Sequence, residues 1–491
     1  MLIRVGLDDI KVILRDTGSL LKWSAVIYLI PLIVSIWFRS PGFVDETIAF
    51  VSVSLISYLV GLALEKAFKT EANTGLKHAF MTTAIIWLVF TAFAAVPFVL
   101  IQEMSFVDSF FEAMSALTTT GLSMMASSIN SAPQSIIFWR SLLSWIGGVG
   151  IVLLALIGVL STYTRAAKLM TAEGRADQIK PNLKNSLKQI WAIYFLFTII
   201  GAVLLVIVPN GLDPFTALNY SMSAISTTGM DTVQGGLQTL VGSGNLLWVE
   251  IVLVLLMLAG AVSFSVHYLF LRKRQMGAYF QDSEFRIFLL LAVISAFLVI
   301  PKFGLEFQQI ADTIFHIVSA LSCGGFAVVP FSEIMQWDDF VKLVLVGLMF
   351  IGGSAGSTAG GIKISRAWIF AKSVYWQMKR SILPKNSFFK REFEGHEVDD
   401  VMIKEISQFI ILYGALILIG VLVLVFYGFP LGSSLFEVVS AQSNVGIGTG
   451  ITGPAMPLAA KIMLILNMWI GRLEIIPIMA AVGFMLSLGK R

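Results

Sequence analysis

Long apolar stretches without charged residues recur along the chain from residue 23 to the C-terminal end. The clearest of them cover residues 79–102, 141–164 and 189–212. Each is longer than the roughly 20 residues that a helix needs to cross about 30 Å of hydrocarbon. Lipid offers no hydrogen-bond partner to an exposed backbone, and the stretches lack the alternation of barrel strands. The pattern therefore predicts membrane-spanning helices.

A short motif occurs four times between these apolar stretches. The copies read FFEAMSALTTTG at residues 110–121, LNYSMSAISTTG at 218–229, IFHIVSALSCGG at 314–325 and LFEVVSAQSNVG at 435–446. In each copy a Ser-Ala pair begins six residues before a glycine. One such pair is typical of small-residue packing between membrane helices. Four copies with one offset indicate an internal repeat.

Each copy is too short to cross a membrane. About 11 residues of amphipathic helix rise roughly 16 Å, half the bilayer, so the motif predicts a half-helix that enters and returns. We interpret each unit as a span, a pore half-helix, a filter loop and a second span, arranged pseudo-symmetrically around a central pore. Two leading helices then give an all-α integral membrane protein with about ten crossings. The predicted parts are 1–77 (two N-terminal transmembrane helices), 78–180 (repeat 1), 181–280 (repeat 2), 281–397 (repeat 3, with a broken last helix) and 398–491 (repeat 4).

Composition and charge agree with this class. Hydrophobic residues make up 57% of the 491 positions and charged residues 13%, whereas about a quarter of a soluble domain is charged. Basic residues gather before the first span, after the second, and at 165–188, 272–274, 379–391 and 490–491. The positive-inside rule places these loops and both termini in the cytoplasm. The loops at 165–188 and 379–391 are candidate docking surfaces, for a protein partner or for anionic membrane lipid.

The loop that ends each motif copy has the chemistry of a cation filter. A ring of backbone carbonyls replaces the water of a dehydrated ion without adding full charges to the membrane interior. Glycine lets those carbonyls turn toward the axis, and the C-terminal ends of inward half-helices favour a cation over an anion. Glu112 and Glu437, near the predicted half-helix starts, are either dipole partners or ion-attracting groups. The candidate ion-binding residues are Thr118, Thr119, Thr120, Gly121, Ser226, Thr227, Thr228, Gly229, Ser322, Cys323, Gly324, Gly325, Ser443, Asn444, Val445 and Gly446.

A glycine-rich segment after the third loop is a candidate gate. Five glycines occur within residues 352–361, and each disfavours a helix by about 1 kcal/mol relative to alanine. The span should therefore break, and beneath the third loop it would obstruct the pore. A phosphate loop does not fit, because Ile362 stands where a Walker A loop has lysine; close packing of small residues is the alternative. The candidate gate residues are Gly352, Gly353, Ser354, Gly356, Ser357, Thr358, Gly360, Gly361, Lys363 and Arg472.

Arg472 joins this set because it interrupts the last apolar span together with Glu474. Charges inside a membrane are costly unless paired, and by default they mark a pathway. We expect Arg472 beside a cavity below the filter, where its positive charge limits ion occupancy. The alternative is a structural contact with Glu474 or with a loop carbonyl.

The repeat with its four glycines resembles the Trk/Ktr/HKT superfamily of potassium transporters, and most closely its TrkH-like membrane subunits. The resemblance covers nearly the whole chain. It implies that the filter residues coordinate potassium, that an intramembrane loop lies at the candidate gate, and that an arginine occupies the place of Arg472. It also implies homodimers with one pore each and a cytoplasmic nucleotide-binding regulatory subunit resembling TrkA. Gly121 fits the potassium-selective relatives, whereas Asn444 and Val445 depart from the threonine-rich pattern.

These features predict potassium uptake across a bacterial inner (plasma) membrane, driven by the membrane potential at about 2.3 kcal/mol per charge per 100 mV. We expect no enzyme, no cofactor other than potassium as the transported species, and no nucleic-acid partner. Coupling to protons or sodium stays open. The alternatives are a sodium-permeable or weakly selective cation transporter, an ion-coupled solute symporter and an intramembrane enzyme.

Overall fold

The computed structural model describes residues 6–72, 75–150, 183–209, 211–242, 246–384, 389–393 and 396–473. These residues form helices and connecting loops, together with one antiparallel pair of two-residue strands, β1 (Glu392–Phe393) and β2 (His396–Glu397). The predicted all-helical membrane fold is confirmed. Sequence analysis missed the strand pair, which lies in the connection between the third and fourth units.

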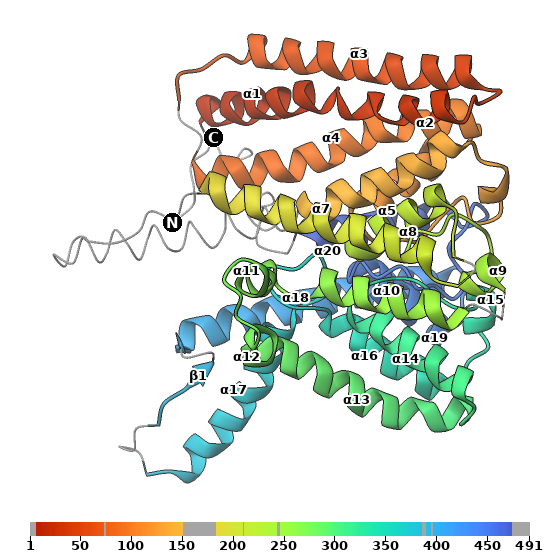
Figure 1. Ribbon diagram of the computed structural model, residues 1–491. Helices are drawn as coiled ribbons and strands as arrows, with labels where there is room; N and C mark the ends of the chain where they lie inside the picture. The colour runs from red at the N-terminus through yellow and green to blue at the C-terminus, as the bar shows by residue number, and fades with distance from the viewer. Residues whose placement is uncertain are drawn as a thin grey trace.

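Two antiparallel helical segments precede the repeats. The first consists of α1 (Leu7–Ser24), the turn η1 (Ile27–Leu29) and α2 (Pro31–Trp37), and α3 (Phe43–Ala67) returns beside it. Figure 1 shows α3, α1 and α4 as successive layers along one side of the protein. The apolar side chains of Val44, Ile48 and Leu55 on α3 are 67%, 60% and 55% exposed. Such an exposed apolar face is suited to lipid contact.

The four units follow in chain order. Unit 1 contains α4 (Leu76–Gln102), α5 (Phe106–Leu117), the turn η2 (Ile129–Ser131) and a helix from 134 that reaches the edge of the described residues at 150. Unit 2 contains α7 (Leu183–Ile207), α8 (Pro214–Ile225), α9 (Leu237–Val241), α10 (Leu246–Ala261), α11 (Phe264–Leu271) and α12 (Ala278–Gln281). Unit 3 contains α13 (Ser283–Phe303), α14 (Phe307–Leu321), α15 (Phe331–Ile334), α16 (Asp339–Ile351) and α17 (Ile364–Ile382). Unit 4 contains α18 (Asp400–Phe426), α19 (Leu431–Gln442) and α20 (Leu458–Leu473).

Within the described ranges, six helical segments are long and apolar enough to cross a membrane, or seven if the bent pair α10 and α11 counts as one span. The helix at 134–150 and α20 reach the edge of the described residues, and α16 stops at Ile351. The count of about ten crossings, the unit boundaries and the part of the predicted span beyond residue 150 therefore stay predictions.

The short helices α5, α8, α14 and α19 are the predicted half-helices, and they lie in the centre of the fold (Figure 1). Side-chain caps begin two of them: Ser105 accepts a hydrogen bond from the backbone N–H of Asp108, and Asp213 accepts from Phe215 and Thr216. Such caps satisfy N–H groups that the helix itself leaves unpaired. Contacts between units close the arrangement, because α5 packs against α20, α10 against α14, and α16 against α19.

The crossing of α1 and α3 gives a first test of this packing. A Cβ atom added to Gly61 would lie 2.6 Å from the Gly18 carbonyl oxygen and 2.6 Å from the Lys22 nitrogen. We predict that Gly61→Ala lowers the free energy of unfolding by about 1–3 kcal/mol, because the helices must separate. The midpoint of thermal unfolding in detergent measures this change.

Gly414→Ala on α18 is the matched control, because nothing lies within 4 Å of its added Cβ. This substitution should leave stability unchanged or raise it by about 1 kcal/mol through helix propensity. Equal unfolding midpoints for the two variants would contradict the close contact of α1 with α3.

Candidate functional site

The four predicted filter loops share one backbone path. The second residue of each loop has a positive φ, although only glycine adopts that region freely. These φ angles are 53° at Thr119, 53° at Thr227, 58° at Cys323 and 53° at Asn444. The loop glycines follow with φ of 93° at Gly121, 73° at Gly229, 77° at Gly325 and 101° at Gly446. A conformation that is uncommon for non-glycine residues and recurs four times indicates a constraint common to all four units.

Hydrogen bonds from each loop back to its own half-helix supply that constraint. The N–H of the third loop residue donates to the carbonyl oxygen of the motif serine in every unit. The distances are 2.8 Å from Thr120 to Ser115, 3.0 Å from Thr228 to Ser223, 2.7 Å from Gly324 to Ser319 and 2.9 Å from Val445 to Ser440. Such a helix end, with a left-handed residue and a six-residue bond, turns the loop N–H groups toward the helix.

The loop glycines of all four units meet at one place. A Cβ atom added to Gly121 would lie 2.0 Å from the Thr228 carbonyl oxygen, and one added to Gly446 would lie 2.1 Å from that of Thr120. A Cβ on Gly325 would lie 2.2 Å from the Val445 carbonyl oxygen. Neighbouring loops therefore touch through backbone atoms, and no residue larger than glycine fits without a shift.

Loop carbonyls at this meeting point have no donor. Among the residues that the structure describes, none donates a hydrogen bond to the carbonyl oxygens of Thr120, Thr228, Gly324 or Val445, and all four residues are buried. The nearby hydroxyl groups bond to one another, at 2.8 Å between Thr118 and Thr120. Buried carbonyls are normally paired, so these oxygens offer a site for a cation. The described ranges contain no cluster of His, Cys, Asp or Glu that could hold a metal ion instead.

The helix at 134–150, α10 and α20 close units 1, 2 and 4, and each contacts the half-helix of its own unit through a glycine. An added Cβ on Gly147 would lie 1.8 Å from the Leu117 carbonyl oxygen. An added Cβ would lie 2.6 Å from the Ile225 carbonyl oxygen at Gly260 and 1.8 Å from the Gln442 carbonyl oxygen at Gly471. Sequence analysis did not assign these glycines a role, although each stands alone or paired within an apolar stretch. They bring backbone into contact with the last residue of three half-helices.

The glycine-rich segment interrupts the third unit where its composition predicts. The helix α16 ends at Ile351 and α17 begins at Ile364, and Gly352, Gly356 and Gly361 between them each have φ of 73°. The segment 352–363 contacts the second and fourth units where their half-helices end. Thr358 Oγ1 donates to the Ile225 carbonyl oxygen at 3.0 Å, and the Gly361 N–H donates to that of Ser443 at 3.1 Å.

A second helix, in unit 2, is also interrupted, and the interruption lies beside the segment 352–363. Sequence analysis missed it. The apolar stretch from 246 to 271 bends by 105° between α10 and α11. Backbone N–H groups of Ser354 and Thr358 donate to the carbonyls of Ala261 (2.9 Å) and Gly260 (3.0 Å), and Phe264 donates to Gly356 (3.2 Å). The two interrupted helices thus satisfy each other's free backbone groups. Gly260 is the nearest glycine, but one glycine inside an apolar helix does not by itself predict a break.

Arg472 lies buried between three units. Its Nη1 donates to the Thr358 carbonyl oxygen at 2.8 Å, and its Nη2 donates to that of Gly147 at 2.9 Å. Of the contacts considered from sequence, the one with a loop carbonyl is present, and Glu474 lies outside the described residues. Lys363 bonds to the Ala359 carbonyl within the segment, and Glu284 accepts from the N–H groups of Ala355 and Ser365.

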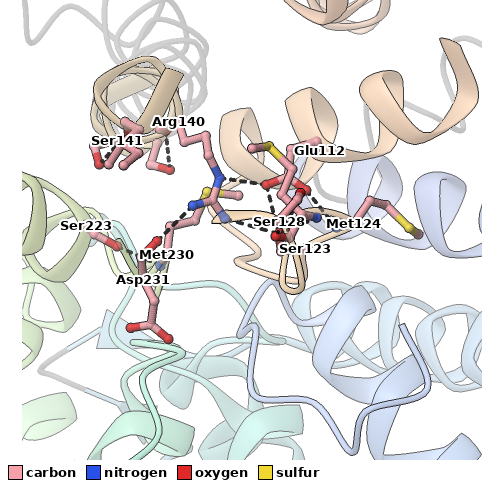
Figure 2. A network of polar contacts seen from close by, with 12 residues as sticks. Glu112, Ser123, Met124, Ser128, Arg140, Ser141, Ser223, Met230 and Asp231 are labelled. Atoms are coloured by element: carbon pink, nitrogen blue, oxygen red, sulfur yellow. Dashed lines mark hydrogen bonds and ion pairs between the residues drawn. The ribbon is translucent and has the colours of Figure 1, made fainter. Parts of the chain in front are cut away.

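A network of polar contacts joins Glu112 and Arg140 to the chain segments that follow the first two loops (Figure 2). Arg140 Nε bonds to Glu112 at 2.7 Å, and its Nη1 reaches the Asp231 carbonyl oxygen at 2.8 Å. Burial raises the pKa of the Asp231 carboxyl to about 7, although Tyr220 and Arg140 favour its ionised form.

The two acidic residues of the motif are not placed as expected. Glu112 is the seventh residue of α5 and Glu437 the seventh of α19, and both are fully buried. They lie beyond the first helical turn, and only within that turn would a dipole partner be effective. Instead they bond to the chain that follows each filter loop.

Known proteins resemble this chain over nearly its whole length. A profile of the TrkH family, described as cation transport protein, matches residues 47–488. The chain is 32% identical over 477 residues to a cation transporter of Methanocaldococcus jannaschii, covering 97% of this chain and 96% of that protein. It is 27% identical over 486 residues to the Trk system potassium uptake protein TrkH of Salmonella typhimurium, with 95% and 96% covered. The crystal structure of the potassium transporter TrkH from Vibrio parahaemolyticus has the same fold, with a TM-score of 0.83 at 24% identity over 96% of this chain and 98% of that one.

Proposed function

Because this chain belongs to the TrkH family of cation transport proteins, which are transporters and not enzymes, we propose that it conducts potassium ions into the cell through its four filter loops. The observation that carries the proposal is the set of buried loop carbonyls that have no hydrogen-bond donor among the described residues. Four chemically neutral oxygens around one axis replace the hydration shell of a monovalent cation at low electrostatic cost. The C-terminal ends of the half-helices point at the same place and add partial negative charge.

Potassium is the proposed ion for two reasons. Both the Salmonella relative and the Vibrio structure are named for potassium. In addition, the glycine in each of the four loops has no side chain, so backbone oxygens of neighbouring loops come close to it.

A sodium-permeable transporter is the second candidate, and the fourth loop favours it. There the Asn444 side chain bonds to Thr120 Oγ1 at 3.0 Å and to the Met468 carbonyl at 2.9 Å, so one side of the ring differs chemically from the others. A solute symporter has less support, because the four units repeat one order of elements.

The segment 352–363 and Arg472 are proposed to form the gate. Hydrogen bonds from Thr358 and Gly361 tie the segment to the undersides of the second and fourth loops. Arg472 holds the same segment from the fourth unit. Conduction then requires these bonds to open, and the membrane potential supplies the driving force.

The cellular setting is proposed from charge and from the relatives. Basic residues at 379–391, which include Lys379 and Arg380 on α17, favour the cytoplasmic side for this end of the protein and for both termini. The proposed membrane is a bacterial inner membrane. The basic loop at 165–188 lies almost wholly outside the described residues. The proposed partners are a second copy of the chain, membrane lipid and a cytoplasmic nucleotide-binding subunit resembling TrkA, since the Salmonella relative is named for a Trk system.

Gly121→Ser tests the proposed function. The added Cβ meets the Thr228 carbonyl oxygen at 2.0 Å, so the ring must distort. In liposomes containing the purified protein, we predict that the potassium-to-sodium permeability ratio falls by about tenfold or more, equivalent to about 1.4 kcal/mol. Gly453→Ser is the control, because nothing lies within 4 Å of its Cβ. Wild-type protein without potassium flux, or an unchanged ratio in Gly121→Ser, would contradict the proposal.

Thr358→Val tests the gate. The substitution keeps the shape of the side chain and removes the bonds of Oγ1 to the carbonyls of Ile225 and Gly260. Because the hydroxyl has one proton to share between the two carbonyls, its loss removes about 1 kcal/mol and shifts a closed-to-open equilibrium by roughly fivefold. We predict faster potassium uptake with the ion preference unchanged, and the same direction for Arg472→Ala.

Thr313→Val serves as the control for the gate, because Thr313 Oγ1 bonds only within its own helix, to Gln309 at 2.7 Å. Initial rates of rubidium-86 uptake into liposomes measure all three variants. Rates in Thr358→Val and Arg472→Ala that match those of Thr313→Val would remove the segment from the gating role.

A further inference from the structure

One position of the half-helix carries a buried polar side chain in all four units. Three residues before the motif serine stand Glu112, Tyr220, His316 and Glu437. Their exposed fractions are 0%, 0%, 5% and 0%. A polar residue at this buried position in all four units is unexpected in an apolar membrane helix, because each uncompensated polar group there costs free energy.

Each of these side chains bonds to the chain that leaves its own filter loop on the outer side. The N–H of Met124 donates to Glu112 Oε2 at 2.7 Å, and that of Thr449 donates to Glu437 Oε2 at 2.7 Å. The N–H of Val328 donates to His316 Nε2 at 3.2 Å. In these three units the partner lies twelve residues after the half-helix side chain. Tyr220 instead donates its hydroxyl to Asp231 Oδ1 at 3.2 Å.

The histidine bond requires a neutral ring. His316 Nδ1 lies 2.7 Å from the Asp312 carbonyl oxygen, which only accepts, so Nδ1 carries the proton. Nε2 then has a free lone pair for the Val328 N–H. The third unit therefore makes the same kind of contact as the two glutamates, with nitrogen in place of a carboxylate oxygen.

The contacts of units 1 and 2 are linked. Arg140 binds Glu112 and also the Asp231 carbonyl oxygen, while Tyr220 binds the Asp231 carboxylate (Figure 2 shows Arg140 between Glu112 and Asp231). Glu437 has hydroxyl and backbone partners, since Thr449 and Thr452 each donate both an N–H and an Oγ1–H. Buried carboxylates with several donors are held firmly in place.

We propose that Glu112, Tyr220, His316 and Glu437 are positioning residues that fix the width of the filter and so determine its ion preference. Each loop is held on its inner side by the bond to the motif serine and on its outer side by this second contact. A loop fixed at both ends cannot move inward to follow a smaller ion. The inference rests on the proposed conduction through the filter.

Glu437→Gln is the principal test. The amide replaces one acceptor oxygen with an NH₂ group, which then faces the donors of Thr449 or Thr452. In liposomes containing the full-length protein, the potassium-to-sodium permeability ratio should fall by about tenfold, while potassium flux falls much less. Tyr220→Phe removes a single hydroxyl and should lower the ratio about threefold. It decides the question if Glu437→Gln does not fold.

Glu46→Gln is the matched control. Glu46 is 1% exposed and accepts hydrogen bonds from the hydroxyls of Ser35 and Ser40, far from the filter in the N-terminal helices. The potassium-to-sodium permeability ratio of Glu46→Gln should equal that of the wild type. Ratios in the folded Glu437→Gln or Tyr220→Phe variants that match Glu46→Gln would overturn the inference. A wild-type protein without potassium preference would instead overturn the proposed function, so the two failures are distinguishable.

Discussion

The structure depends on how each half-helix ends. Three consecutive loop N–H groups bond to the carbonyls of the last helical turn in every unit, and the bond to the motif serine is the longest-range of them. These loop N–H groups are thereby hydrogen-bonded to the half-helix, and the loop carbonyls point away from it toward the place where the four loops meet. A backbone that is not helical can exist at membrane depth only where its polar groups find partners. An ion is the partner that we propose for the carbonyls, so the same constraint that shapes the loop would also create the proposed site.

The rest of the fold keeps these four ends in register. Gly147, Gly260 and Gly471 let the backbone of the closing helices approach the half-helix carbonyls more closely than any side chain allows. The interrupted helices of units 2 and 3 then exchange backbone hydrogen bonds below the filter. Because the segment 352–363 bonds to the second and fourth loops at once, a movement of this segment changes contacts directly beneath the ring.

Sequence predicted the features that have local causes. Repeated glycines at one offset identified the four loops, and the glycine density at 352–361 identified the broken helix of unit 3. Features that need contacts between units were not predictable. The bend after Ala261 depends on donors from Ser354 and Thr358 in another unit, and Arg140 connects unit 1 to Asp231 of unit 2. Glu112 and Glu437 were identified, but their partners include backbone N–H groups twelve residues away, which no charge pattern reveals.

The most direct measurement is the position of a bound ion. Crystals of the protein grown in rubidium chloride give an anomalous signal from the ion itself. The account predicts a peak on the axis, surrounded by the carbonyl oxygens of Thr120, Thr228, Gly324 and Val445, and its loss when sodium replaces rubidium. Rubidium bound only elsewhere, in a protein that transports rubidium, would contradict the claim that these carbonyls coordinate the ion.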